Sequence, residues 1–116
     1  MATTLFGIVN CDSIKKTQKW LLQNNVSYQF HDYRKNGLSK TLLENILQHI
    51  NWSELLNKRS TSYRNLSEQQ KESINEDTII DLFIEFPTLI KRPLLVHKNK
   101  YLVGFNINAY ENLFSK

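Results

Sequence analysis

The sequence predicts an α/β fold built on a mixed four-stranded sheet, and three observations lead to this prediction. The first third of the chain shows a strand pattern, a helix pattern and a second strand pattern, which is typical of a right-handed β-α-β unit with parallel strands. The middle of the chain carries helical patterns only, and the last quarter shows two short strands and a helix. With 116 residues, 41% of them hydrophobic, the chain is long enough for one domain with its own core.

The first strand and helix are predicted from residue types and spacing. The run Thr3 to Val9 is rich in β-forming residues, and the polar residues 10–12 interrupt it. From Ser13 onward apolar residues recur on one helical face, with Asp12 or Ser13 as the expected N-cap. The pattern of Val26 to Tyr33 then predicts the second strand.

A helical insertion is expected at about residues 38–90. Ser39 is the expected N-cap of its first long helix, and a polar stretch covers residues 58–65. Ser67 and Gln70 match a capping box, which opens another helix. Apolar residues at helical spacing predict that this acidic region is a solvated helix with one buried stripe, formed by Ile79, Leu82, Phe83 and Phe86.

The C-terminal part completes the predicted sheet. Leu94 to Val96 and Tyr101 to Val103 are predicted as short strands around a turn, and a closing helix is expected from about Ile107 to Phe114 with Asn106 as its cap. This order of elements fits a thioredoxin-like sheet that carries a helical insertion. We expect a single domain over residues 1–116.

The charged residues are distributed unevenly along the chain. Fifteen Lys and Arg against eleven Asp and Glu give a net charge of +4, yet residues 67–86 hold six acids and one base. Because no nucleic-acid motif accompanies the bases, we expect no nucleic-acid partner; a small anionic ligand explains them at least as well. The bases form three short groups: Lys15, Lys16 and Lys19; Lys58, Arg59 and Arg64; Lys91 and Arg92.

Cys11 is the one cysteine of the chain. A single cysteine excludes an internal disulfide, a Cys-rich zinc site and a two-cysteine redox motif within the chain. No metal site is predicted. The sequence shows neither a signal-peptide pattern nor an apolar run of the roughly 20 residues that cross a bilayer. We therefore expect a cytoplasmic protein without membrane contact.

The position of Cys11 favours a reactive thiol over the alternative of a small buried apolar residue. At the border between strand and helix, free backbone N–H groups and the helix dipole stabilise a thiolate, and Lys15 adds positive charge. Thr17 stands six residues on, where a phosphatase-type loop needs arginine, and Ile14 stands where a C-x-x-C motif needs cysteine. Any disulfide chemistry of Cys11 therefore needs a sulfur from outside the chain.

Several motifs, in order along the chain, resemble those of the arsenate reductase (ArsC) family, closest to its YffB-like branch and related to the Spx regulators. The resemblance covers nearly the whole chain and implies a thioredoxin-like fold with a nucleophilic Cys11. The motifs are Phe6-Gly7-Ile8, Asn10-Cys11-Asp12, Lys15-Lys16, Trp20-Leu21, Phe30 to Lys35, Asn57-Lys58-Arg59-Ser60-Thr61, Tyr63-Arg64, Ile90-Lys91-Arg92-Pro93 and Val103-Gly104-Phe105.

The resemblance implies a glutathione-dependent thiol reductase. In the family's reductases the thiolate attacks an oxyanion such as arsenate, glutathione captures the adduct as a mixed disulfide, and a glutaredoxin releases the product. Anion- or glutathione-binding roles follow by resemblance for six residues: Asn10, Lys15, Arg59, Arg64, Arg92 and Pro93. The Arg92-Pro93 bond is expected to be cis, with a trans proline as the alternative. The physiological substrate stays open, because Phe105 and its neighbours offer no counterpart to the family's third arginine.

Two other functions stay open beside the enzyme. One is a Spx-like regulator that binds RNA polymerase, although a Spx-type switch needs two nearby cysteines and this chain has one. The other is a protein that binds glutathione without turnover. For Arg59 and Arg64 a place on the solvated surface is the alternative to a role in the site.

Overall fold

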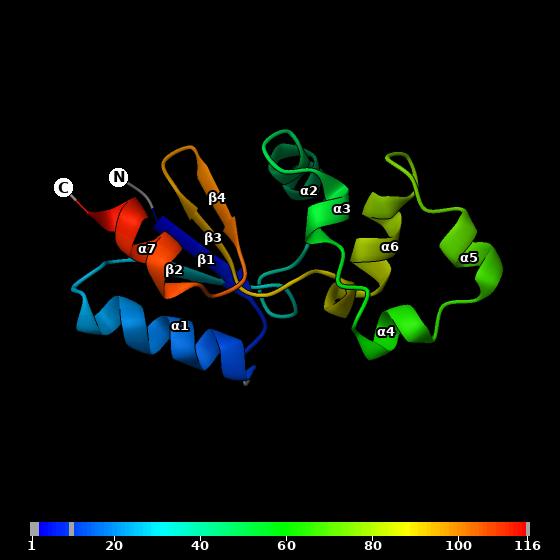
Figure 1. Cartoon of the computed structure of the whole chain (residues 1–116). Helices are drawn as coiled ribbons and strands as arrows, with labels where there is room; N and C mark the ends of the chain where they lie inside the picture. Colours follow the sequence, from blue (N-terminus) through cyan, green and yellow to red (C-terminus); the bar gives the residue numbers. More distant parts are fainter. Residues whose placement is uncertain (1–2, 10, 116) are drawn as a thin grey trace. The chain divides into compact units, whose positions relative to one another are not determined.

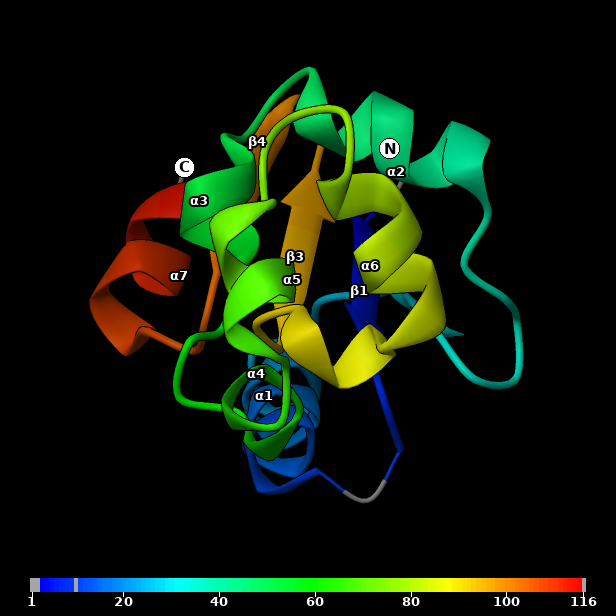
Figure 2. The same cartoon turned by 90° about the vertical axis from the view of Figure 1, so that its right-hand side faces the viewer.

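The computed structural model describes residues 3–9 and 11–115, which form two compact units. The sheet unit combines the two ends of the chain, up to Lys35 and from Arg92 onward. The helical unit spans Asn36–Lys91. Figures 1 and 2 show the strands within the first unit and the short helices of the second.

The sheet unit holds a mixed four-stranded sheet with the strand order β2-β1-β3-β4. Strand β1 (Thr3–Gly7) pairs in parallel with β2 (Gln29–Asp32) and antiparallel with β3 (Leu94–His97). Strand β4 (Lys100–Val103) pairs antiparallel with β3. The predicted fold class, an α/β fold on a mixed sheet, is confirmed.

Two helices cover one face of this sheet. Helix α1 (Asp12–Gln23) joins β1 to β2, and α7 (Ile107–Phe114) follows β4. The core beneath them includes four described side chains with 0% exposure, two from the paired strands β1 and β3 and one from each helix: Leu5, Leu95, Leu21 and Tyr110. Burial of this apolar face provides the main stabilisation of the layer.

The helical unit consists of short helices whose chain ends are tied together. A backbone bridge pairs Leu56 with Ile90, and the N–H groups of Asn57 and Lys91 donate to the carbonyl oxygens of Leu89 and Leu55, at 2.7 and 2.8 Å. The elements are α2 (Lys40–Leu47), α3 (Trp52–Leu55), α4 (Thr61–Arg64), α5 (Glu68–Glu72), α6 (Ile79–Glu85) and the 3₁₀ helix η1 (Pro87–Leu89).

Local capping signals predicted several helix starts correctly. The Ser39 hydroxyl accepts the N–H of Leu42 at 3.1 Å, and Ser67 forms the expected capping box with Gln70. The closing helix begins after Asn106, whose side chain accepts the N–H of Ala109 at 3.0 Å. These caps satisfy donors that lack a partner inside the helix.

Two local predictions were wrong: the acidic region as one helix and the start of the second strand. The acidic region forms two helices, because the side chain of Asn75 accepts the N–H groups of Asp77 and Thr78 and interrupts the chain between α5 and α6. In the polar stretch 58–65, for which no element was predicted, the structure has the short helix α4, capped by Ser60. Strand β2 begins only at Gln29, since its pairing with β1 starts there.

Candidate functional site

Cys11 occupies the N-cap of α1, and the expectation of Asp12 or Ser13 as the cap was wrong. The backbone of Cys11 is extended, with φ −87° and ψ 131°, so the helix begins at the next residue. Its carbonyl oxygen accepts the N–H of Lys15 at 3.0 Å, the first bond of the helix. The side chain is half-buried, which leaves the sulfur within reach of a ligand.

The surroundings of Cys11 favour its thiolate. Burial raises the pKa of the thiol, but the backbone N–H groups of Ile14 and Ser13 and a hydrogen bond and the positive charge from the Arg92 side chain lower it. The net pKa lies below the ordinary value for cysteine. A lowered pKa at a helix start beside a cation is the environment of a reactive cysteine.

Arg92 reaches Cys11 because of the sheet register. Phe6 of β1 pairs with Leu94 of β3, so the residues just before β3 lie at the end of β1 from which the chain leads to Cys11. The bond between Arg92 and Pro93 is cis, as expected. Pro93 is buried, and its carbonyl oxygen accepts the N–H of Gly104 at 2.8 Å.

Asp32 anchors the loop that leads to Cys11. It is 2% exposed, and its Oδ2 accepts the backbone N–H of Val9 at 3.1 Å. Its Oδ1 accepts the N–H groups of Arg34 and Lys35 at 2.8 and 3.2 Å. Burial raises the pKa of the Asp32 carboxyl, but these three hydrogen bonds have the larger effect, and the net pKa lies below the ordinary value. The carboxyl group is therefore ionised at neutral pH.

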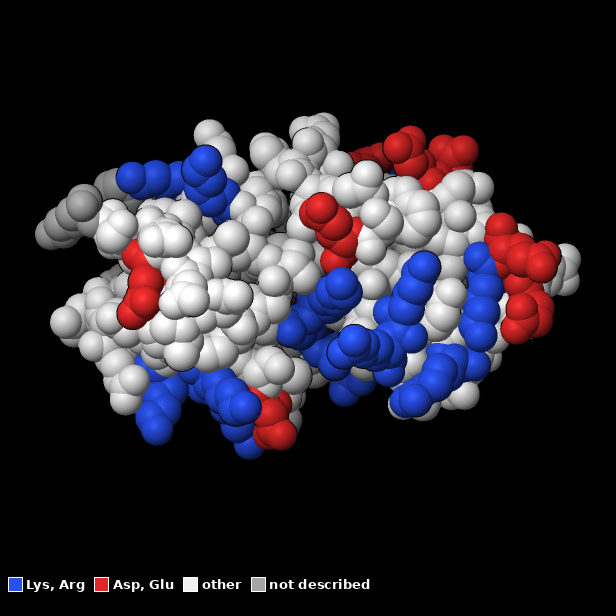
Figure 3. All heavy atoms as spheres, viewed as in Figure 1, with Lys and Arg blue, Asp and Glu red and all other residues white. Residues whose placement is uncertain are grey.

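The remaining predicted residues are described each within its own unit. Lys15 is exposed on α1, and Asn10 lies outside the described residues. Arg59 and Arg64 are exposed in the helical unit, where Figure 3 shows basic side chains gathered over the region of α4. The Arg59 N–H donates to Asn57 Oδ1 at 3.1 Å, and Arg64 Nη2 to Thr61 Oγ1 at 3.4 Å. Their roles toward Cys11 stay predictions.

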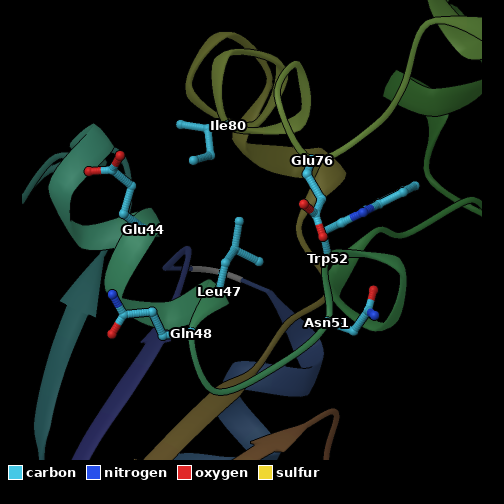
Figure 4. Close-up of a pocket in the computed structure, with 7 residues that line it drawn as sticks. All are labelled: Glu44, Leu47, Gln48, Asn51, Trp52, Glu76 and Ile80. Carbon is cyan, nitrogen blue, oxygen red and sulfur yellow. The ribbon is translucent and has the colours of Figure 1, made fainter.

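A separate hollow of about 300 Å³ lies within the helical unit. In Figure 4 the side chains of Leu47 and Ile80 point into it. Its lining includes two carboxylates and no Lys or Arg, so it does not match an anionic ligand. The lining residues are Glu44, Leu47, Gln48, Asn51, Trp52, Glu76 and Ile80.

Neither a cluster of metal ligands nor a membrane-spanning helix is found among residues 3–9 and 11–115. No group of three or more His, Cys, Asp and Glu side chains in this part of the chain could hold a metal ion. None of its helices is long and apolar enough to span a membrane.

Tyr33, which follows β2, is a buried residue that the sequence did not single out. It is 3% exposed, its hydroxyl has no hydrogen-bond partner among the described residues, and the charge of Arg92 acts on it. A tyrosine at the end of a strand is ordinary core material by sequence. What distinguishes Tyr33 from other buried tyrosines is the positive charge of Arg92, which the sequence alone does not place.

Comparison with known proteins identifies the family and supports the fold. The model of the ArsC family matches residues 6–113. An uncharacterised protein of Haemophilus influenzae is 44% identical over 112 residues, which cover 97% of this chain and 98% of that protein. The global transcriptional regulator Spx of Streptococcus pyogenes is 29% identical over 97% of this chain and 85% of its own length.

Solved structures extend the comparison to the fold. The structure of a YFFB protein superposes with a TM-score of 0.89 at 37% identity, over 96% of this chain and 97% of its own. A glutaredoxin of Archaeoglobus fulgidus, 14% identical, gives a TM-score of 0.50 over 100% of this chain and 89% of its own, a likeness of fold alone. The fold is thioredoxin-like, and by the match over residues 6–113 this chain belongs to the ArsC family.

Proposed function

We propose that this protein is a glutathione-dependent thiol reductase of the arsenate-reductase type, with Cys11 as its nucleophile. The observation that carries the proposal is the half-buried Cys11 at the start of α1, with its pKa lowered by backbone N–H groups and by Arg92. Membership of the ArsC family supports the same class of chemistry. The thiol belongs in a reducing compartment such as the cytoplasm, where cysteines stay reduced.

The Cys11 thiolate attacks an oxyanion or a disulfide. With oxidised glutathione, a bond forms between the Cys11 sulfur and one glutathione sulfur, while the other leaves as a thiolate. On an oxyanion, the sulfur replaces one oxygen, which leaves as water. Arg92 stabilises the negative charge next to the sulfur in both cases.

Resolution requires an external thiol, because the chain has one cysteine. On the oxyanion route, one glutathione thiolate first attacks the Cys11 sulfur, and the substrate leaves with the bonding electron pair, reduced by two electrons; this step gives the mixed disulfide. A second glutathione or a glutaredoxin then attacks the mixed disulfide and returns Cys11 as a thiolate. Two external thiols become one disulfide in each cycle and supply two electrons to the substrate. In this proposal Asn10, Lys15, Arg59, Arg64 and Pro93 hold the anionic substrate or the carboxylates of glutathione.

Intact-mass analysis after incubation with oxidised glutathione tests the proposal. We expect the wild-type chain to gain one glutathionyl group and Cys11→Ser to gain none. An unmodified wild type would leave the reductase without its glutathione step. If reduced glutathione nevertheless bound to that protein in a calorimetric titration, a binding protein without turnover would be the better description.

A regulator of the Spx type is the second candidate. The 29% identity to a Spx protein over 97% of the chain favours it. Because this chain has a single cysteine, such a regulator would bind RNA polymerase without a two-cysteine switch. Co-purification with the polymerase from a native extract would support this candidate, and repeated failure to co-purify would count against it.

A further inference from the structure

The hollow of the helical unit has no role in the proposed function. Its volume of about 300 Å³ is at the lower end of the range of small-molecule sites. Its polar lining side chains are exposed and its apolar ones are half-buried, so a ligand can reach it from solvent. All of its lining residues belong to the segment 36–91, and Cys11 is not among them.

Two carboxylates lie on opposite sides of this hollow. Glu44 belongs to α2, and Glu76 lies in the turn before α6. In Figure 4 the apolar side chains of Leu47 and Ile80 lie between them. Asn75 fixes the turn that carries Glu76, because its side chain accepts two backbone N–H groups there. The hollow therefore combines an apolar floor with a negative charge at each side.

Neither carboxylate is neutralised by the described part of the chain. No Lys or Arg side chain lines the hollow. No described base lies within ion-pair distance of Glu44 or Glu76, whereas an ion pair of 3.9 Å joins Lys71 to Glu68. The segment 67–86 adds to the negative potential around Glu76, because it holds six acids and one base. The ligand that matches this hollow is therefore a cation.

We propose that this hollow binds a linear aliphatic diamine. The alkyl chain lies on Leu47 and Ile80, and the two ammonium groups pair with the carboxylates of Glu44 and Glu76. A single positive charge can pair with one carboxylate only, so two carboxylates on opposite sides select a ligand with a charge at each end. The half-buried ring of Trp52, also in the lining, offers an ammonium group a cation–π contact.

An NMR titration with cadaverine, an aliphatic diamine, tests this proposal, because the two tryptophans of the chain report on different units. Trp52 lines the hollow, and Trp20 packs against the core of the sheet unit. We expect cadaverine to shift the indole N–H signal of Trp52 in a saturable way, with roughly millimolar affinity since exposed ion pairs contribute little. The signal of Trp20 should not move. The monoamine pentylamine should bind about threefold more weakly, and the dianion glutarate should not bind.

Glu44→Gln and Glu76→Gln each remove one charge and keep the shape of the side chain. Each should weaken cadaverine binding about threefold, and both together about tenfold. In either single variant, cadaverine should lose its advantage over pentylamine. Glu54→Gln is the matched control, because Glu54 is an exposed acid of α3 that does not line the hollow. It removes the same charge from the same unit and should bind cadaverine like the wild type.

Each of three results would overturn this inference: no saturable shift at Trp52, equal binding of cadaverine and pentylamine, or equal weakening by Glu54→Gln. Equal binding of the two amines would mean that the hollow holds a single cation, such as a lysine side chain of a protein partner. The titration does not involve the thiol, so Cys11→Ser should bind cadaverine like the wild type. Diamine binding and the glutathione reaction can therefore fail independently.

Discussion

The Arg92 side chain lowers the pKa of Cys11, although the two residues stand near opposite ends of the chain. Antiparallel pairing of β1 with β3 brings them together, with Phe6 opposite Leu94. Strand pairing therefore brings the positively charged Arg92 to the Cys11 thiol at the start of α1. The charge of Arg92 and the backbone N–H groups at the helix start both stabilise the thiolate. The two effects come from different residues, so a substitution can remove the first without the second.

Removing the guanidinium should make Cys11 a more ordinary thiol. We expect Arg92→Gln to raise the pKa of Cys11, because the variant loses the guanidinium group that favours the thiolate. The rate of iodoacetamide alkylation against pH measures this pKa. Lys91→Gln removes the neighbouring exposed charge and should leave the profile unchanged. Identical profiles for both variants would contradict the role of Arg92.

The sequence predicted the parts of this protein that depend on neighbours along the chain. Ser39 and Asn106 cap helices through N–H groups three residues ahead, so their side chains alone identify the helix starts. Cys11 stood out because a strand pattern and a helix pattern meet there. The break at Asn75 escaped prediction, since an Asx-type turn competes with a helix on nearly equal terms.

The rest of the site depends on strand pairing, which the local pattern does not contain. Arg92 and Pro93 were assigned to the site from a family resemblance, and the structure gives the physical cause for Arg92 in the β1–β3 register. Tyr33 was missed because its unpartnered hydroxyl becomes visible only when the side chains around it are placed.

Asp32 should stabilise the fold at neutral pH and lose this effect in acid. Its carboxylate accepts three backbone N–H groups, so we expect Asp32→Asn to lower the free energy of unfolding by about 2 kcal/mol at neutral pH. The pKa of Asp32 is lowered in the folded state. Its stabilisation is therefore fully present above the unfolded pKa and disappears as pH falls through the folded pKa.

Urea unfolding followed by tryptophan fluorescence, at neutral pH and in acid, measures this effect. The difference between wild type and Asp32→Asn should shrink as pH falls. Asp81→Asn, an exposed position on α6, should change the free energy of unfolding by less than about 0.5 kcal/mol. A difference that is independent of pH would show that the Asp32 charge is not responsible.

Gly7 is required for close packing of β1 against α1. A Cβ atom added there would meet Cδ1 of Ile14 and lie 2.8 Å from its Cγ1, and Ile14 is 1% exposed. We expect Gly7→Ala to cost about 1–3 kcal/mol of stability, as overpacking in cores does. Adding Ile14→Val removes the nearest methyl group, so the double variant should lose less than the sum of the two single losses. Strict additivity in urea unfolding would refute the contact.

Arg59 is either a residue of the site or a solvated loop arginine, and a substitution distinguishes these two roles. If it binds a carboxylate of glutathione, Arg59→Gln should slow mixed-disulfide formation about tenfold, the value of one charged hydrogen bond. The pKa of Cys11 should stay unchanged, because the groups that lower it are Ile14, Ser13 and Arg92. Stopped reactions with oxidised glutathione, analysed by intact mass, measure the rate.

Arg34→Gln is the matched control for Arg59, since it removes another exposed arginine that has no assigned role in the site. Each variant loses one positive charge, so a general loss of attraction for anionic glutathione affects both alike. A selective loss in Arg59→Gln would therefore report a specific contact. Equal rates in the two variants would place Arg59 on the solvated surface, and Arg92 would then be the arginine on which binding beside Cys11 depends.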